Sequence, residues 1–126
     1  MKTLIAFCTT HGCTEKTANE LKNFLGNNTT LCNLKKDQVP DLDIFDRIII
    51  GGSIHAGKIQ KTVKLFCDRN IEILKQKELG LFICCMESGE NAQKQLVNAF
   101  PAELHDAAKA STYFGGEFNF GKMNFF

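Results

Sequence analysis

Three threonine hydroxyls and one glycine are gathered in residues 9–14, TTHGCT, between the apolar run 4–8 and a helix-like segment that starts at Glu15. Free backbone amides at the start of a helix, together with the positive end of the helix dipole, bind anions. The segment contains no lysine or arginine, so it predicts an anion site built from amides and hydroxyls. A capped turn without a ligand is the alternative, because threonine and glycine are common turn residues.

Loops that carry out phosphate chemistry have signatures that this segment lacks. The chain contains neither the GK[ST] loop of nucleotide-hydrolysing proteins nor a GxGxxG dinucleotide motif. A phosphatase loop of the Cys-x5-Arg type would start at Cys8, but Thr14 stands where the arginine would clamp the phosphoryl group. A phosphorelay receiver would carry paired aspartates where Phe7 and Cys8 stand. The segment therefore favours phosphate binding over phosphate chemistry.

Two further polar segments follow apolar strands. They are residues 52–57, GSIHAG, and residues 86–91, MESGEN. In an open parallel sheet the carboxyl ends of the strands meet at one edge, and ligands bind there at the point where the strand order reverses. The three polar segments are therefore expected to form a single site.

The elements that would position these segments alternate between strand and helix. Short apolar runs indicate strands buried on both faces, and apolar residues at helical spacing indicate helices between them. The expected strands are 3–8, 29–34, 48–50, 79–86 and 110–116, and the expected helices are 15–25, 59–74, 91–100 and a short one that begins at Pro101. Gly51 and Gly52 are expected to end the third strand. This alternation predicts an α/β fold with a doubly wound, five-stranded parallel sheet in three layers.

The length of 126 residues predicts a single domain, 1–126. The sequence has no marked excess of positive or negative charge. The net charge is +1 at pH 7, which argues against a nucleic-acid partner, because phosphate neutralisation needs a basic excess. No stretch approaches the roughly 18 apolar residues of a membrane span, so no transmembrane segment is expected. The cytoplasm is the expected location.

The six cysteines include no Cys-x-x-Cys pair. They are expected to be small buried side chains rather than metal ligands or disulfides, with Cys13 alone exposed. The last twelve residues, GGEFNFGKMNFF, leave no room for a helix after the fifth strand. We therefore expect either a domain truncated before its last helix or a tail that packs elsewhere, and an apolar sheet face that is exposed, which lowers solubility, or covered by a second molecule in a homo-oligomer.

Residues 9–14 resemble the phosphate loop of the flavodoxin family, [ST]-x-T-G-x-T, with His11 in place of the threonine at the third position. Residues 48–59, IIIGGSIHAGKI, are similar to the strand and flavin loop of the flavodoxin-like branch that includes the menaquinone-dependent protoporphyrinogen oxidases. The resemblance extends in order and spacing over nearly the whole chain. It implies the strand order 2-1-3-4-5, FMN as cofactor and electron transfer as activity.

The resemblance also implies which residues contact the cofactor, and it implies no metal ligand. The first segment would hold the FMN phosphate, the second would line one side of the flavin ring, and the third would flank the other side. The implied cofactor-binding residues are Thr9, Thr10, His11, Gly12, Cys13, Thr14, Ser53, Ile54, His55, Ala56, Gly57, Met86, Glu87, Ser88, Gly89, Glu90 and Asn91. A redox protein or a small-molecule electron donor or acceptor would be the partner.

Several alternatives stay open at this point. The protein can be a plain electron carrier, a protoporphyrinogen oxidase-like oxidoreductase, or a cofactor-free interaction module that keeps the fold. The near-neutral charge and the lack of an aromatic residue in 86–91 favour the oxidase-like branch over a generic carrier. His11 can carry a charge beside a phosphate or fill the turn. Cys13 can be a reactive thiol at the start of a helix.

Overall fold

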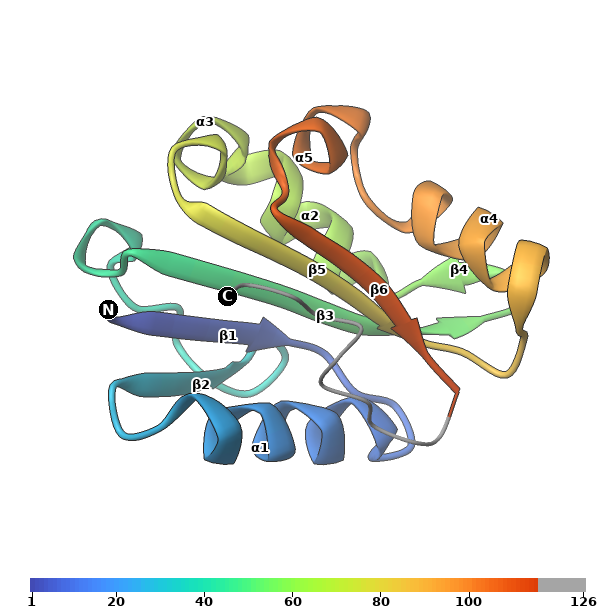
Figure 1. Ribbon diagram of the computed structural model, residues 1–126, viewed down its shortest axis with the longest axis horizontal. Coiled ribbons are helices and arrows are strands. Elements are labelled where there is room, and N and C mark those ends of the chain that lie inside the picture. The colour runs from blue at the N-terminus through green and yellow to red at the C-terminus, as the bar shows by residue number, and fades with distance from the viewer. Residues whose placement is uncertain (116–126) are drawn as a thin grey trace.

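Five parallel strands form the centre of the computed structural model, which describes residues 1–115 (Figure 1). The strand order is β2-β1-β3-β5-β6, and a short strand β4 pairs antiparallel with β3. The strands are β1 Thr3–Phe7, β2 Thr29–Asn33, β3 Arg47–His55, β4 Lys58–Ile59, β5 Glu78–Cys84 and β6 Ala110–Phe114. Without β4, which the sequence did not predict, this is the expected order 2-1-3-4-5.

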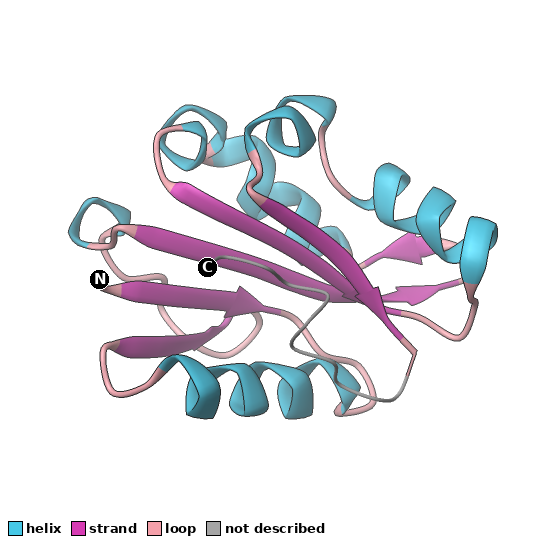
Figure 2. Cartoon of the chain, in the orientation of Figure 1, coloured by secondary structure: helices cyan, strands magenta, loops and turns pink. Residues whose placement is uncertain are grey.

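Helices cover both faces of the sheet, so the predicted three-layer α/β fold is confirmed (Figure 2). One face carries α1, and the other carries α2 to α5. The helices are α1 Cys13–Leu25, α2 Lys61–Arg69, α3 Ile71–Lys75, α4 Gly89–Ala99 and α5 Ala102–Ala107, with a 3-10 turn η1 at Leu42–Ile44. The parallel strands need such crossovers because the end of one strand lies far from the start of the next.

The apolar strands are buried on both faces, as their uninterrupted runs predict. All of β1 is buried, and Ile48, Ile49 and Ile50 in β3 are inaccessible to solvent. Ile49 belongs to the buried cluster under α1, whereas Ile48 and Ile50 belong to the cluster under the other helices. The alternation of side chains along a strand thus supplies both cores from one sequence run.

The prediction that Gly51 and Gly52 end the third strand is wrong, because β3 continues to His55. A Cβ atom on Gly51 would overlap the ring of Phe82 on the neighbouring strand β5. A Cβ on Gly52 would lie 2.7 Å from the side chain of Ile59 and 2.8 Å from Gln60 Oε1. The two glycines therefore make room for neighbouring side chains within the strand.

Two helix predictions also change in the structure. The expected helix 59–74 is two helices that meet at Asn70, whose side-chain amide donates a 2.8 Å hydrogen bond to the Phe66 carbonyl. This bond caps the end of α2 and turns the chain. The last part of the third polar segment, residues 89–91, is the first turn of α4 rather than loop.

The predicted uncovered sheet face is not found at the described strands. Phe82 and Phe114, which lie on the α1 side of the sheet, are both buried, with ring centroids 5.9 Å apart. The predicted truncation before a last helix concerns residues 116–126, which lie outside the described residues. Self-association stays a prediction, which the size of the purified protein in solution tests.

Candidate functional site

The first polar segment forms a tight turn between β1 and α1. Gly12 adopts a left-handed conformation with φ +88°, and its amide donates to Thr9 Oγ1 at 2.9 Å. The helical ladder begins with the Lys16 amide, which donates to the Gly12 carbonyl at 2.9 Å. The amides of residues 13–15 precede this ladder, so their N–H groups point out of the helix start.

The Thr14 hydroxyl is inaccessible to solvent and forms no hydrogen bond of ordinary geometry with residues 1–115, although it lies close enough to the Cys84 thiol to lower the pKa of that thiol. Leaving a buried hydroxyl unpaired costs about 1–3 kcal/mol. The hydroxyls of Thr9 and Thr10 do accept hydrogen bonds, from the Gly12 amide and from Gln60 respectively. Thr14 is therefore the hydroxyl of this turn that lacks a partner and is placed for a ligand.

Gln60, the residue before α2, joins the first two segments. Its Nε2 lies 2.6 Å from Ser53 Oγ, 3.1 Å from Thr10 Oγ1 and 3.3 Å from the Cys8 carbonyl. Its Oε1 accepts the Ser53 amide at 2.9 Å. Gln60 was not among the predicted site residues, which end at Gly57 in this segment. A polar side chain before a helix carries no sign of partners about fifty residues away.

The second polar segment is a β-hairpin between β3 and β4 rather than a loop. His55 pairs with Lys58, and the two residues at the tip, Ala56 and Gly57, both have positive φ, 51° and 79°. Two consecutive positive φ angles are the requirement of a type I′ turn, the two-residue turn that matches the twist of a hairpin. Ala56 is the only non-glycine residue with positive φ in the described part of the chain.

A cavity of about 180 Å³ lies where the three segments meet. It is lined by His11, Cys13, Ser53, Ile54, His55, Cys84, Cys85, Met86 and Gly115. The structure thus brings together His11 and Cys13 of the first segment, residues 53–55 of the second, and Met86 of the third. Pockets that enclose a whole cofactor measure about 300–1,000 Å³, so this cavity would hold only part of such a ligand.

The other predicted site residues lie outside the cavity lining. Thr9, Thr10, Gly12 and Thr14 form the neighbouring turn, and Ala56 and Gly57 form the hairpin tip. In the third segment Glu87 and Ser88 are exposed, and Gly89, Glu90 and Asn91 are exposed residues of α4. The Glu87 carbonyl accepts the Cys85 thiol at 3.6 Å. The third segment therefore contributes mainly Met86 to the cavity.

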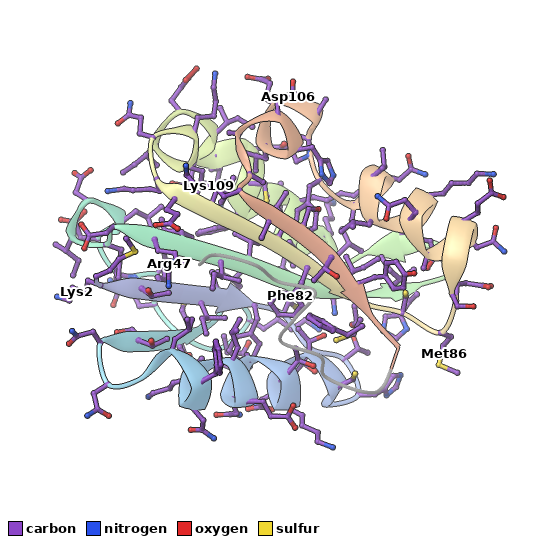
Figure 3. All side chains as sticks on the ribbon, in the orientation of Figure 1. Lys2, Arg47, Phe82, Met86, Asp106 and Lys109 are labelled. Atoms are coloured by element: carbon purple, nitrogen blue, oxygen red, sulfur yellow. The ribbon has the colours of Figure 1, made fainter. Side chains whose placement is uncertain are left out.

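Met86 is fully exposed at 99% and projects from the loop after β5 (Figure 3). A large apolar side chain in this position loses no packing when it moves, and its thioether adapts to the shape of a flat neighbour. Met86 is therefore placed to cover a ligand that occupies the cavity.

Two histidine rings lie together at the cavity, one from the first segment and one from the second. The rings of His11 and His55 meet edge to face with centroids 5.3 Å apart. His55 Nε2 lies 3.4 Å from Ser53 Oγ, two residues earlier on the same side of β3. Within residues 1–115, no three histidine, cysteine or acidic side chains are arranged to hold a metal ion.

Two buried thiols form part of the cavity wall. Burial raises the pKa of the Cys84 thiol to about 12, and the nearby hydroxyls of Thr17 and Thr14 lower this pKa only in part. Burial likewise raises the pKa of Cys85, against the lowering effect of the Glu87 backbone. Both groups therefore stay neutral at neutral pH. The prediction that Cys13 alone is exposed, with the other five cysteines buried, is confirmed.

The comparison with known families decides the identity of the fold. Residues 4–126 match the sequence model of a family described as a flavodoxin domain. The chain belongs to the flavodoxin family. The strand order and the position of the site at the carboxyl ends of β1, β3 and β5 agree with this membership. No curated protein sequence matches this flavodoxin-family chain.

Solved structures similar to this flavodoxin-family chain include three of bacterial origin. Rubredoxin oxygen:oxidoreductase from Desulfovibrio gigas has a TM-score of 0.66 and 20% identity, covering 96% of this chain and 32% of its own. A flavoprotein from Lactobacillus acidophilus, solved in complex with FMN, has a TM-score of 0.63 and 18% identity, covering 89% and 91%. Flavodoxin 1 from Bacillus cereus has a TM-score of 0.59 and 19% identity, covering 81% and 78%.

These identities show a shared fold. The chain spans about a third of the length of the first two structures, the Desulfovibrio gigas enzyme and the flavodiiron protein from Giardia intestinalis. In the described part of the chain, every helix is too short or too polar to span a membrane.

Proposed function

We propose that this flavodoxin-family chain binds FMN and transfers electrons through it. The observation that carries the proposal is the turn at the start of α1, where the unpaired buried hydroxyl of Thr14 lies beside helix amides that precede the ladder. Membership of the family and the FMN complexes of the Lactobacillus acidophilus flavoprotein and of a Fusobacterium nucleatum flavodoxin variant support it. Bound FMN supplies a ring that accepts and releases one or two electrons.

The phosphate of the cofactor would bind to the turn formed by residues 9–14. The amides of residues 13–15 and the hydroxyls of Thr10 and Thr14 are the donors, and the positive end of α1 stabilises the negative charge. Thr9 keeps the turn closed through its bond with the Gly12 amide. Because the turn contains no lysine or arginine, amide and hydroxyl dipoles would hold the dianion, and His11 is the one side chain of the turn that can add a positive charge.

The flavin ring would lie over the cavity. Ser53, Ile54 and His55 would line one side, with Ala56 and Gly57 at the hairpin tip, and residues 86–91 would flank the other side. The cavity is too small to enclose the whole cofactor, so one edge of the ring would enter it and the rest would stay near solvent. Met86 is free to pack on the exposed part. Ile54 and His55 are held by pairing with β4, and Ser53 is held by Gln60.

A titration of the purified protein with FMN tests this function. We expect flavin fluorescence to be quenched with a stoichiometry of one. Riboflavin, which lacks the phosphate, should bind at least about tenfold more weakly, a difference of about 1.4 kcal/mol. Equal affinity for FMN and riboflavin would exclude the proposed phosphate site. A protein that takes up neither flavin would support the cofactor-free interaction module instead.

A second candidate function is a flavin oxidoreductase of the protoporphyrinogen oxidase type. The edge-to-face pair His11–His55 beside the cavity favours it, because a substrate that loses protons with its electrons needs nearby groups that accept them, whereas a carrier does not. The test supplies the FMN-loaded protein with menaquinone and protoporphyrinogen. Turnover that His55→Gln lowers, with FMN binding retained, would support this candidate. Transfer to a redox protein alone would support the carrier.

The free cysteines suit the proposed cytoplasmic location.

A further inference from the structure

We propose that Cys13 and Cys84 are a reactive thiol pair, which exchanges with small-molecule disulfides and closes to an intramolecular disulfide in the cavity wall. Cys13 is the first residue of α1 and is exposed. Cys84 is the last residue of β5 and is buried. Both line the same cavity. The proposal does not depend on flavin binding.

Helix α1 carries Cys13 on the helix face that packs against Cys84. Thr17 Oγ1 lies 3.6 Å from Cys84 Sγ, so this face of α1 rests on the end of β5. Cys13 precedes Thr17 by four residues and therefore lies one turn away on the same helix face. The Cys13 thiol contributes to the raised pKa of both Cys84 and Cys85, so it lies near both thiols.

The neighbouring Cys85 is the alternative partner, but its side chain points to the other face of the sheet. Cys84 belongs to the buried cluster under α1, whereas Cys85 belongs to the cluster under α2 to α5. The Cys85 thiol is already engaged with the Glu87 carbonyl. Cys84 is therefore the thiol on the side of the sheet that α1 covers, and it is the partner that we assign to Cys13.

The reaction takes place in two exchanges. The Cys13 sulfur, as thiolate, attacks one sulfur of a small disulfide such as oxidised glutathione, so that a mixed disulfide forms and one thiol leaves. The Cys84 sulfur then attacks Cys13 Sγ, the bond from Cys13 to the small molecule breaks, and the Cys84 proton passes to the departing thiolate, which leaves as the second small thiol. In sum the protein dithiol loses two electrons and two protons, and the small disulfide is reduced to two thiols.

Mass spectrometry of the purified protein after incubation with oxidised glutathione tests the proposal. We expect a product that has lost two hydrogen atoms, in which two of the six thiols no longer react with an alkylating agent. Proteolytic fragments should show a bond between Cys13 and Cys84. Dithiothreitol should restore the starting mass.

Three variants separate the steps. Cys84→Ala should stop at the mixed disulfide on Cys13, and Cys13→Ser should give no product. The matched control Cys32→Ser, a buried cysteine outside the cavity, should react like the unchanged protein. A glutathione adduct that persists in the unchanged protein would overturn the proposal, and so would a bond from Cys13 to Cys85 or closure that survives Cys13→Ser.

Discussion

Gln60 and Ser53 are joined by two hydrogen bonds, one from the Ser53 amide to Gln60 Oε1 at 2.9 Å and one from Gln60 Nε2 to Ser53 Oγ at 2.6 Å. The same Nε2 faces Thr10 Oγ1 and the Cys8 carbonyl. A single amide side chain thus fixes the cavity end of β3 against the turn that follows β1. The relative position of the proposed ring and phosphate sites depends on it.

Gln60→Glu should weaken both the fold and the site. The carboxylate has no N–H to offer Thr10, Ser53 and the Cys8 carbonyl, and it places a negative charge next to that carbonyl oxygen. We expect a loss of about 1–3 kcal/mol in the free energy of unfolding at pH 7. The affinity for FMN should fall about tenfold. Urea denaturation and FMN titration measure the two effects.

Gln93→Glu is the matched control, because Gln93 is an exposed residue of α4 outside the cavity. It introduces the same charge and should leave the stability within about 0.5 kcal/mol. If Gln60→Glu behaved like Gln93→Glu in both measurements, the bridge between the two segments would have no energetic role.

Gly51→Ala should destabilise the protein by about 1–3 kcal/mol through overpacking. The new methyl group would overlap the ring of Phe82, which is fully buried in the cluster under α1. In a Phe82→Leu background the same glycine substitution should cost much less, because the ring atoms that it meets are gone. Equal costs in the two backgrounds, measured by denaturation of all four proteins, would exclude this contact as the reason for the glycine.

A substitution at the hairpin tip should make the protein more stable. Ala56 has φ 51°, a conformation that costs a non-glycine residue about 1–2 kcal/mol, and asparagine tolerates it better. Ala56→Asn should therefore raise the free energy of unfolding by about 0.5–1 kcal/mol. At the next residue, which has φ 79°, the substitution Gly57→Ala should lower the free energy of unfolding by about 1–2 kcal/mol. The same sign of change for both would contradict the type I′ turn.

Local patterns in the sequence were sufficient to predict the alternation of strands and helices and the three segments that meet at the site, whereas the strand order 2-1-3-4-5 was implied by the resemblance to the flavodoxin family. The apolar run before TTHGCT, the run of isoleucines at 48–50 and the run at 79–85 each follow from burial on both faces. A strand buried in this way leaves its polar ends at one edge, so the position of the site follows from the topology.

The predictions from sequence are wrong where a distant contact outweighs a local rule. Gly51 and Gly52 resemble a strand end, but the close approach of Phe82, Ile59 and Gln60 requires them inside β3. Gln60 itself was missed because its partner Cys8 lies 52 residues away in the sequence. Such contacts exist only after the sheet has formed, so no window along the chain contains them.

Alkaline pH should destabilise the protein through its buried thiols. Burial and the negative charge of Asp68 raise the pKa of Cys67 from the ordinary value of 9.0 to about 12, and the pKa of Cys84 is raised to about 12 as well. Below pH 9 folded and unfolded chains both keep these protons. Between about pH 9 and 12 only the unfolded chain loses them, so stability should fall by up to about 1.4 kcal/mol per pH unit for each thiol.

Urea denaturation at a series of pH values from 8 to about 10.5 measures this slope. Cys67→Ala removes one titrating thiol, so its stability should decline less steeply, even though the variant starts from a lower value because of the cavity. A slope equal to that of the unchanged protein would show that Cys67 ionises in the folded state.

Thr14→Val should change stability and ligand affinity in opposite directions. The Thr14 hydroxyl is buried and has no hydrogen-bond partner among the described residues, so valine of similar shape should stabilise the protein without ligand by about 1–3 kcal/mol. If that hydroxyl binds the FMN phosphate, the affinity for FMN should fall about tenfold, while riboflavin binding stays the same. Denaturation without ligand and titration with both flavins measure these effects.

Thr112→Val is the matched control for this pair of effects. Thr112 is buried in β6, and its hydroxyl donates to the Tyr113 carbonyl at 3.5 Å, so removing it should not stabilise the protein and should leave FMN binding unchanged. If Thr14→Val lowered the stability of the ligand-free protein as well, the hydroxyl would already be satisfied by the fold. Its lack of a partner could then no longer support a phosphate site at the start of α1, because a ligand would gain nothing from pairing it.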